Sequence, residues 1–398
     1  MAKKIIIGIT GSIAAFKSVQ LISDLIKQGY TIEVLMSESA TQFVTPTSIQ
    51  SLTKRKVYVD TFDDENPAII THIDIVKDAD LFMIVPATAH TIAKVAYGMA
   101  DNMLTSAFLA ATCPKLIAPA MNVHMYENPI TQQNIQKLKD LGVYFVEPTQ
   151  GLLACGDIGN GKLADEEDLI DMIDFALSSK PLQGKKVLVS AGPTQESIDP
   201  VRFITNHSSG KMGYALAKAA FCLGAEVTLV SGPTHLRKPY GIKIIDVLSA
   251  EDMYQSIQAF APLQDIIIMA AAVGDYKCQN IANNKIKKKD DTLDLILHKN
   301  KDILYELGQN KKDNQIICGF AMETENLIKN ATHKLKEKNC DMIVANHLKT
   351  AGAGFKGDTN IVTLITQQGT KHLEKMSKVE LSYHIFDILL NMEEKICY

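Results

Sequence analysis

The 398 residues of this chain carry a formal net charge of -4, so electrostatics give no support for nucleic acid as a main partner. Its seven cysteines form no CxxC pair, which argues against a zinc site or a disulfide framework and favours a reducing compartment. The start of the sequence is unlike a signal peptide, and no apolar run reaches the ~20 residues of a membrane helix. We therefore expect a cytoplasmic protein without a membrane partner.

The sequence begins an α/β pattern twice. Residues 3–12 and 185–194 share a pair of lysines, a short apolar run and a glycine turn. Such a run predicts a buried parallel strand, and ligands of parallel sheets bind at the carboxyl ends of the strands. The pattern therefore predicts an α/β fold with two doubly wound, Rossmann-like domains. We place them at residues 1–178 and 185–398, joined by a linker over 179–184 that contains Pro181.

Apolar runs and glycine turns predict the elements of the first half. Strands are expected over residues 5–9, 31–36, 81–85, 115–118 and 143–146. Helices are expected over 11–26, 128–141 and 166–177, with another that starts at the cap 100–102 and runs to 111. Four glycines within residues 151–161 predict a mobile loop over 147–162.

The first glycine turn differs from the dinucleotide fingerprint. Residues 8–15 have the spacing G-x-x-G-x-x-A rather than G-x-G-x-x-G, and Ser37 stands where a ribose-binding acid is expected. NAD is therefore disfavoured, while a phosphate site and a plain tight turn both stay open. Considered one at a time, each candidate residue has an ordinary interpretation. His72 is then expected to be structural, Asn122 to lie in an ordinary turn, and Cys155 to be a thiol without a role in catalysis.

These pieces gain meaning from their order. The turn at 8–15, His72, the run 86–89 and the Pro-x-Met-Asn-x-x-Met motif at 119–125 together resemble the homo-oligomeric flavin-containing cysteine decarboxylases. The match covers nearly all of residues 1–178 and implies a flavodoxin-like flavoprotein. The FMN-binding residues that it implies are Gly11, Ser12, Ile13, Ala14, Ser37, Thr88 and Met121. Two positions depart from the family pattern, with His90 where Asn is frequent and Tyr126 where Trp is common.

The same resemblance implies roles for three reactive side chains. His72 would act as an acid/base or carboxylate-positioning group, and Asn122 would bind the substrate carboxylate. Cys155 would lie on a flap over the substrate and supply a proton. The implied reaction is the FMN-dependent decarboxylation of 4'-phosphopantothenoylcysteine to 4'-phosphopantetheine.

The second glycine turn is long and rich in serine. Its Ser-Gly-Lys segment does not make a P-loop, because Thr205 and Met212 stand where Gly and Ser or Thr are required. A helix start with exposed amides remains, which suits an anion. A strand over 266–269 opens into 270–276, where Asp275 suits a turn, a ligand or a metal. The lysines at 285–289 would by themselves indicate a solvated surface.

Four motifs in series resemble bacterial phosphopantothenate–cysteine ligases over about residues 184–395. They are Asp-Pro-Val-Arg-x-Ile-x-Asn-x-Ser-Ser-Gly-Lys-Met-Gly at 199–213, Ala-Ala-Val-x-Asp-Tyr at 271–276, Lys-x-Lys-Lys at 285–288 and Gly-Phe-x-x-Glu-Thr at 319–324. With both halves in this order, the chain resembles the bifunctional coenzyme A biosynthesis enzymes. Gly274 stands where Ala is usual, and Cys278 where Pro commonly follows.

For the second half the resemblance implies a two-step reaction with CTP and Mg²⁺. The carboxylate of 4'-phosphopantothenate attacks CTP to give an acyl cytidylate, and the amine of cysteine then displaces CMP. The implied nucleotide-binding residues are Ala271, Asp275, Lys285, Phe320, Lys334 and Lys338, with Asp275 also assigned to Mg²⁺. The implied substrate-binding residues are Arg202, Asn206, Gly210 and Lys211. Asn206 would orient the acyl cytidylate, and Lys285 would serve the second step.

The resemblance further implies a homo-oligomer built from trimers, with a dodecamer as the expectation. Two alternatives stay open. The first half could decarboxylate a peptidyl cysteine, or the chain could be a flavin-binding regulatory protein without catalytic activity. Turnover distinguishes the last alternative, because a regulator would bind flavin and remain inert.

Overall fold

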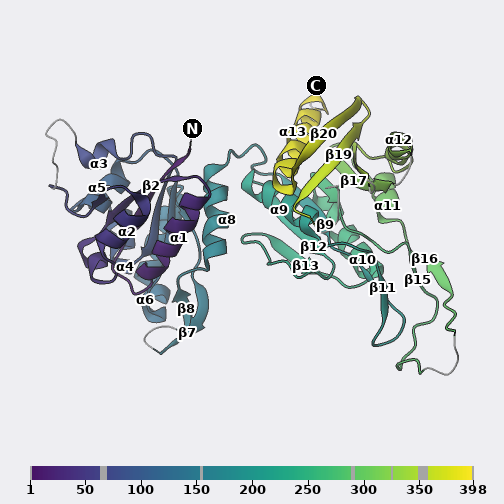
Figure 1. The fold of residues 1–398 in the computed structure, drawn as a ribbon, viewed down its shortest axis with the longest axis horizontal. Coiled ribbons are helices and arrows are strands. Elements are labelled where there is room, and N and C mark those ends of the chain that lie inside the picture. Colours follow the sequence, from purple (N-terminus) through teal and green to yellow (C-terminus); the bar gives the residue numbers. More distant parts are fainter. Residues whose placement is uncertain are drawn as a thin grey trace. The chain divides into compact units, whose positions relative to one another are not determined.

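The computed structural model describes residues 2–62, 70–152, 156–287, 292–323, 326–347 and 357–396. The chain divides into two compact units, Met1–Ser178 and Ser179–Tyr398, each with its own central sheet (Figure 1). Both sheets are mainly parallel and carry helices on both faces. The predicted α/β fold with two Rossmann-like domains is therefore confirmed.

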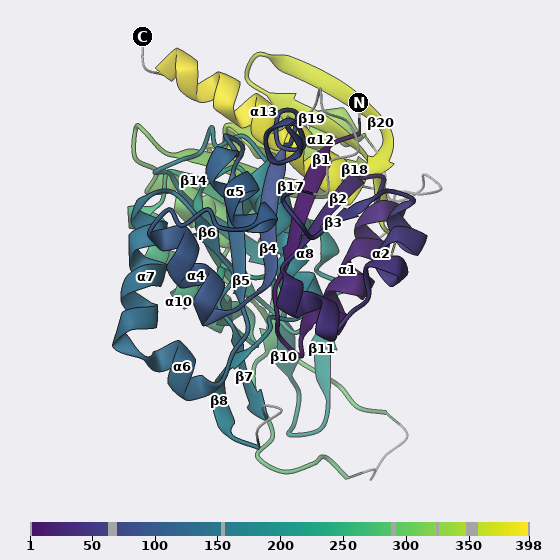
Figure 2. The same cartoon turned by 90° about the vertical axis from the view of Figure 1, so that its left-hand side faces the viewer.

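The first unit is built on a six-stranded parallel sheet in the order β3-β2-β1-β4-β5-β6. Its strands are β1 (Lys4–Ile9), β2 (Thr31–Met36), β3 (Val57–Tyr58), β4 (Leu81–Ala87), β5 (Lys115–Pro119) and β6 (Tyr144–Phe145). Its helices are α1 (Ala15–Lys27), α2 (Pro46–Thr53), α3 (Thr71–Asp74), α4 (Ala89–Ala96), α5 (Met103–Ala110), α6 (Val123–Glu127), α7 (Pro129–Asp140) and α8 (Glu166–Leu177), with the 3-10 turn η1 (Glu38–Gln42). Figure 2 shows α1 and α2 beside the β1–β2 side of this sheet, and α4 and α7 beside its β5 side.

Uninterrupted apolar runs explain the buried strands. All seven residues of β4 are buried, as expected for a parallel strand that is covered on both faces. The strand order reverses between β1 and β4, which places a topological switch point at the carboxyl ends of these two strands. The helix after β1 begins at Ala15 rather than at the predicted residue 11, because residues 11–14 form the turn.

The glycine-rich segment after β6 is ordered into a hairpin. β7 (Thr149–Leu152) and β8 (Ile158–Lys162) pair as antiparallel strands, so the prediction of a loop throughout 147–162 is wrong. The hairpin is fastened to the loop after β5, because the amide of Met121 donates to the Gly161 carbonyl at 3.0 Å. Cys155, which follows β7 in the sequence, lies outside the described residues.

The second unit has an eight-stranded sheet in the order β13-β12-β9-β14-β17-β18-β19-β20. These strands are β13 (Lys243–Asp246), β12 (Glu226–Ser231), β9 (Lys186–Ala191), β14 (Ile266–Met269), β17 (Ile316–Glu323), β18 (Met342–His347), β19 (Thr359–Thr366) and β20 (Gly369–Ser377). Pairing is parallel as far as β18, and β19 and β20 are antiparallel additions. Two small ribbons, β10 (Gln195–Ser197) with β11 (Phe203–Thr205) and β15 (Tyr276–Cys278) with β16 (Leu297–Lys299), project from this sheet.

Two cores cover the faces of this sheet. One gathers α9 (Lys211–Cys222) and α13 (Lys378–Ile396), and the other gathers α10 (Ala250–Phe260), α11 (Ile303–Gln309) and α12 (Leu327–Glu337). Alternation along β18 places Met342 and Val344 in the first core and Ile343 and Ala345 in the second. None of the helices in the described ranges is long and apolar enough to cross a membrane.

Candidate active sites

A hollow of about 420 Å³ opens at the switch point of the first sheet. Residues from the ends of β1, β4 and β5 and from the β7–β8 hairpin line it, as the topology of parallel sheets requires. The lining consists of Gly11, Ser12, Ile13, Ala14, Phe16, Lys17, Thr88, Ala120, Met121, Asn122, Met125, Leu152, Gly161, Lys162 and Leu163. This set includes every predicted flavin residue except Ser37. The Ser37 hydroxyl accepts from the Ala40 amide at 3.3 Å and caps the turn η1.

The residues present suit a flavin nucleotide. The amino end of α1 has no acidic residue in its first turn, and Lys17 adds a positive charge, so the site favours a phosphate. Gly11 is required at the turn, since a Cβ there would lie 2.5 Å from the Ser39 hydroxyl. Thr10 ties the neighbouring strand ends together by donating to the Pro86 carbonyl at 2.6 Å and accepting from the Thr88 amide at 3.0 Å.

Asn122 lines this hollow, and hydrogen bonds from both ends of its side-chain amide hold it. Its Oδ1 accepts from the His124 amide at 2.8 Å, and its Nδ2 donates to Asp157 Oδ2 at 2.8 Å. The amide group of Asn122 therefore contacts a carboxylate, and its binding of a substrate carboxylate stays a prediction from the family resemblance. Tyr126, one of the departures from the family pattern, is buried and donates from its hydroxyl to Glu147.

The hairpin depends on a glycine where it meets this loop. Gly161 has φ +153, and a Cβ there would lie 2.3 Å from the Met121 carbonyl oxygen. We expect Gly161→Ala to destabilise the docked hairpin by about 1–3 kcal/mol and to lower flavin retention. The flavin-to-protein absorbance ratio of the purified variant measures this. Gly151→Ala is the control, since its Cβ would meet Lys162 only at 3.4 Å; equal flavin content in both variants would contradict the prediction.

His72 lies near the amino-terminal ends of the strands of the same sheet. It belongs to α3, and Ile75 just beyond this helix accepts from the ammonium group of Lys4, at the start of β1, at 2.7 Å. The hollow is at the opposite ends of β1 and β4, and the seven residues of β4 span roughly 20 Å. Figure 1 shows α3 far from α6 and the β7–β8 hairpin. One copy of the chain therefore does not bring His72 and Asn122 together.

A second hollow, of about 540 Å³, opens at the carboxyl ends of the strands of the second sheet. The segment 206–213 forms one wall, and 270–273 with Asp275 forms another. The remaining lining residues are Phe320, Ala321, Met322, Lys334, Asn346, Asn360 and Lys378. Of the residues predicted for nucleotide and substrate, Asn206, Gly210, Lys211, Ala271, Asp275, Phe320 and Lys334 meet here. Arg202, Lys285 and Lys338, all within the described residues, lie outside this lining.

The amino end of α9 supplies an anion-binding wall. Gly210 caps it with φ +76, a left-handed conformation that favours glycine, and its first turn has no acidic residue. Gly213 lets the helix approach β9, since a Cβ there would lie 2.5 Å from the Ala191 Cβ. Asn206 fixes the facing wall by donating to the Val273 carbonyl at 2.9 Å.

The lysines in and near this hollow have different hydrogen-bond and ion-pair partners. Lys334 donates to the Phe320 carbonyl at 2.9 Å, whereas Lys338 pairs with Asp302 at 2.8 Å. Lys378 was missed by the sequence interpretation, although it is 6% exposed and lines the hollow. Burial and, to a smaller extent, the nearby Lys211 lower its pKa, because both disfavour a charged ammonium group. No local motif marks Lys378, because the fold of β20 brings it here.

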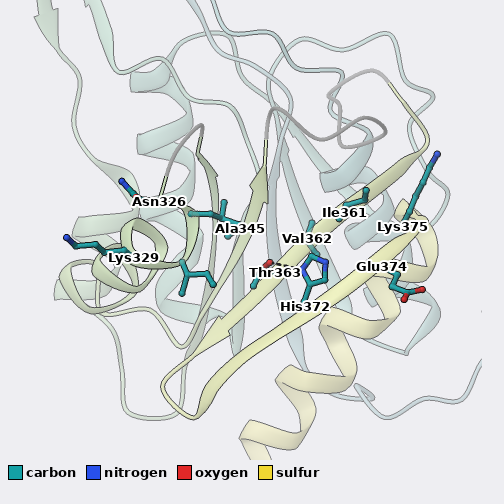
Figure 3. A pocket seen from close by; sticks show the side chains of 11 residues that line it. Asn326, Lys329, Ala345, Ile361, Val362, Thr363, His372, Glu374 and Lys375 are labelled. Carbon is teal, nitrogen blue, oxygen red and sulfur yellow. Dashed lines mark hydrogen bonds between the residues drawn. The ribbon is translucent and has the colours of Figure 1, made fainter.

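A third hollow, of about 820 Å³, lies between α12 and the strands β19 and β20 (Figure 3). Its lining includes Lys329, Thr363, His372 and Glu374, and Thr363 Oγ1 lies 3.1 Å from His372 Nδ1. Among the described residues, none of those predicted for chemistry lines it. The two hollows at the strand ends are therefore the candidate active sites.

Flavin-type and nucleotide-type sites on two α/β units define a class of two-site enzyme, and comparisons with known proteins identify it further. Residues 1–178 match the family described as Flavoprotein. Residues 182–392 match the family described as DNA/pantothenate metabolism flavoprotein C-terminal domain. These matches support a flavin cofactor for the first unit.

Curated relatives match nearly the whole chain. The Coenzyme A biosynthesis bifunctional protein CoaBC of Bacillus subtilis (strain 168) is 47% identical, over 96% of this chain and 95% of that protein. A Cysteine/Cysteine sulfinic acid decarboxylase from an unknown prokaryotic organism is 45% identical, over 88% of this chain and 99% of that protein. A solved C-terminal domain of a CoaBC protein is 42% identical, with TM-score 0.47, over 55% of this chain and 100% of that structure.

The chain belongs to the family of bifunctional coenzyme A biosynthesis proteins. It is an enzyme with a flavoprotein decarboxylase unit and a ligase unit. This confirms the family, the fold and the two activities expected from the sequence.

Proposed function

We propose that unit 2 joins 4'-phosphopantothenate to cysteine with CTP, and that unit 1 decarboxylates the product with FMN. The observation that carries the proposal is the pair of hollows at the carboxyl ends of the two sheets, each beside a helix start that favours phosphate. Each hollow also presents a fixed asparagine, Asn122 in one and Asn206 in the other. One hollow takes the phosphate of a flavin nucleotide, and the other takes a triphosphate.

In the ligase unit, the start of α9 with Lys211, Lys334 and Lys378 binds the anionic groups of CTP. The substrate carboxylate attacks the α-phosphorus, and pyrophosphate leaves with the electrons of the broken P–O bond. Cysteine nitrogen then attacks the acyl carbon, CMP leaves, and the nitrogen loses a proton. Asp275 would supply a carboxylate to hold Mg²⁺, and the ion would offset the negative charge of the triphosphate. Asn206 orients the acyl cytidylate.

In the decarboxylase unit, residues 11–14 hold the FMN phosphate and Met121 packs in the same hollow. FMN supplies a two-electron oxidant for the cysteinyl thiol when bound. Asn122 binds the substrate carboxylate through Nδ2, in place of the Asp157 carboxylate that it now contacts. Cys155 lies outside the described residues, and in this proposal it supplies a proton from the hairpin that covers the substrate.

The proposal includes a homo-oligomer, because His72 reaches a decarboxylase site only from a second copy of the chain. Apolar side chains around the hollow support assembly, since Phe16 is 61% exposed and Leu152 is 70% exposed. We propose trimer-based contacts that build a dodecamer. A cytoplasmic location fits the thiol substrate, and the described cysteines form no disulfide.

Mixed oligomers test the shared site. Neither His72→Asn nor Asn122→Asp is expected to decarboxylate alone, whereas a co-refolded mixture should recover roughly a quarter to a third of wild-type activity by forming intact shared sites. Carbon dioxide release measures the recovery. Co-refolding each variant with itself is the control. If differently tagged variants co-purify in one oligomer and still show no recovery, His72 does not act across copies.

Product analysis by mass spectrometry tests the function itself. The full chain with 4'-phosphopantothenate, cysteine, Mg²⁺ and CTP should give 4'-phosphopantetheine and CMP, with weaker turnover when ATP replaces CTP. Free cysteine and a peptide ending in cysteine are tested separately as decarboxylase substrates, since one relative is named for cysteine. Preference for either would overturn the substrate assigned to unit 1. A flavin-bound, inert protein would support the regulatory alternative.

A further inference from the structure

Lys285 lies outside the ligase hollow, in an excursion between β15 and β16. The two strands pair as a short ribbon, and the Gln279 amide closes the base of the excursion by donating to the Ile296 carbonyl at 2.9 Å. Lys285 itself is exposed, and residues 288–291 lie outside the described residues. The contacts of this segment determine where the backbone of Lys285 lies relative to the ligase hollow.

The turn between β10 and β11 holds the segment on both sides of Lys285. The Ala282 amide donates to the Ile198 carbonyl at 3.1 Å. The Ile286 amide donates to Asp199 Oδ2 at 3.1 Å, and the Ile286 carbonyl accepts from Arg202 Nη2 at 3.0 Å. Both backbone polar groups of the residue next to Lys285 are therefore fixed by one acid and one arginine.

Asp199 has more partners than a turn needs. Its side chain is fully buried and accepts from the amides of Val201 and Arg202 at 2.8 and 2.9 Å, which closes the turn. It also accepts from the Arg202 guanidinium, with Nε at 3.0 Å, and from the Ile286 amide. Arg202 holds the pKa of this carboxyl well below its usual range, so Asp199 stays charged at neutral pH.

These contacts revise the role expected for Arg202. Its guanidinium is engaged by Asp199 and by the Ile286 carbonyl, and the residue lies outside the lining of the hollow. If one charged partner of this network is removed, the other is left with an unpaired charge. The segment at 282–287 would then lose the hydrogen bonds that hold the Ile286 backbone. The turn at 198–202 therefore acts on the segment that carries Lys285.

We propose that Asp199 is a positioning residue for amide formation: through Arg202 and the backbone of Ile286 it sets the place from which Lys285 acts. This inference rests on the proposed ligase function. Misplacing a reacting group by about 1 Å can cost ~100-fold in rate, so the anchor affects chemistry without touching substrate. The first step, in which CTP is bound at the start of α9, does not require the anchor.

The test uses Asp199→Asn in the full chain. Single-turnover mixing with CTP and 4'-phosphopantothenate, followed by cysteine, separates pyrophosphate release from amide formation. We expect pyrophosphate release within about twofold of wild type, amide formation slowed ~100-fold, and acyl cytidylate detected by mass spectrometry. Deuterium exchange of the peptide covering 282–287 should become faster in the variant, independently of activity.

Controls make each outcome decisive. Asp252→Asn is the matched control, because Asp252 also accepts from a backbone amide, that of Ser249 at 2.9 Å in the capping box of α10. This variant should leave the ratio of the rates of pyrophosphate release and amide formation unchanged. Asp199→Glu keeps the charge but shifts the carboxylate, and it should give the same partition if Asp199→Asn does not fold. Equal slowing of both steps, or no change in either, overturns the positioning role. Wild type that forms no acyl cytidylate would instead overturn the proposed function.

Discussion

Asn206→Asp is expected to form acyl cytidylate from CTP and 4'-phosphopantothenate but to convert it to amide at least about 100-fold more slowly than wild type. The Asn206 Nδ2 donates to the Val273 carbonyl at 2.9 Å, whereas a carboxylate cannot donate and would face that oxygen unfavourably. Misplacing a reacting group by about 1 Å can cost ~100-fold in rate, so loss of the bond that orients residue 206 should slow amide formation. The α9 start and its lysines remain intact, so the first step should proceed. Mass spectrometry of quenched reactions measures the accumulated intermediate.

Asn300→Asp provides a matched control for this change. Its Nδ2 donates to the Gly274 carbonyl at 2.9 Å, one residue along the same loop, yet Asn300 does not line the hollow. Any general loosening of the loop should therefore affect both variants. If Asn300→Asp also accumulates acyl cytidylate, the effect belongs to the loop and the orienting role of Asn206 is wrong.

The sequence predicted elements best where the information is local. The bounds of β2, α8 and β14 agree with the predicted residues 31–36, 166–177 and 266–269, because an apolar strand or an amphipathic helix is encoded by its own residues. The β7–β8 hairpin was missed, because its glycines also resemble a loop. Its pairing and its contact with Met121 depend on residues far away in the sequence.

The candidate sites were predictable to the extent that glycine turns mark them. The turn at 11–14 and the helix start at 210–213 line the two hollows, since the helices that follow parallel strands begin at the carboxyl ends of those strands. Lys378 reaches the second hollow only because β19 and β20 reverse direction, which no motif predicts. His72 lies near the amino-terminal ends of the strands because its segment contacts the start of β1. Arg202 is likewise engaged by the carbonyl of Ile286, which is distant in the sequence.

Asn122→Asp should lower decarboxylation at least about 100-fold while the protein keeps its flavin. In the native side chain, Nδ2 donates to Asp157 Oδ2 at 2.8 Å, so this donor already contacts a carboxylate. A carboxylate at position 122 would repel Asp157 and the substrate carboxylate alike, and it would supply no donor. The residues that we propose to hold the flavin phosphate, at the start of α1, follow β1, whereas Asn122 follows β5. Carbon dioxide release and the flavin absorbance measure the two properties separately.

Asn128→Asp separates this effect from damage to the local turn. Asn128 Oδ1 accepts from the Ile130 amide at 2.9 Å, as Asn122 Oδ1 accepts from the His124 amide at 2.8 Å, so both residues cap a helix in the same way. An acid keeps that cap, because a carboxylate accepts such a hydrogen bond. The variant at 128 should therefore decarboxylate normally, whereas the variant at 122 should not. Equal rates in the two variants would mean that the Asn122 side chain does not donate to the substrate. Another group would then bind the substrate carboxylate.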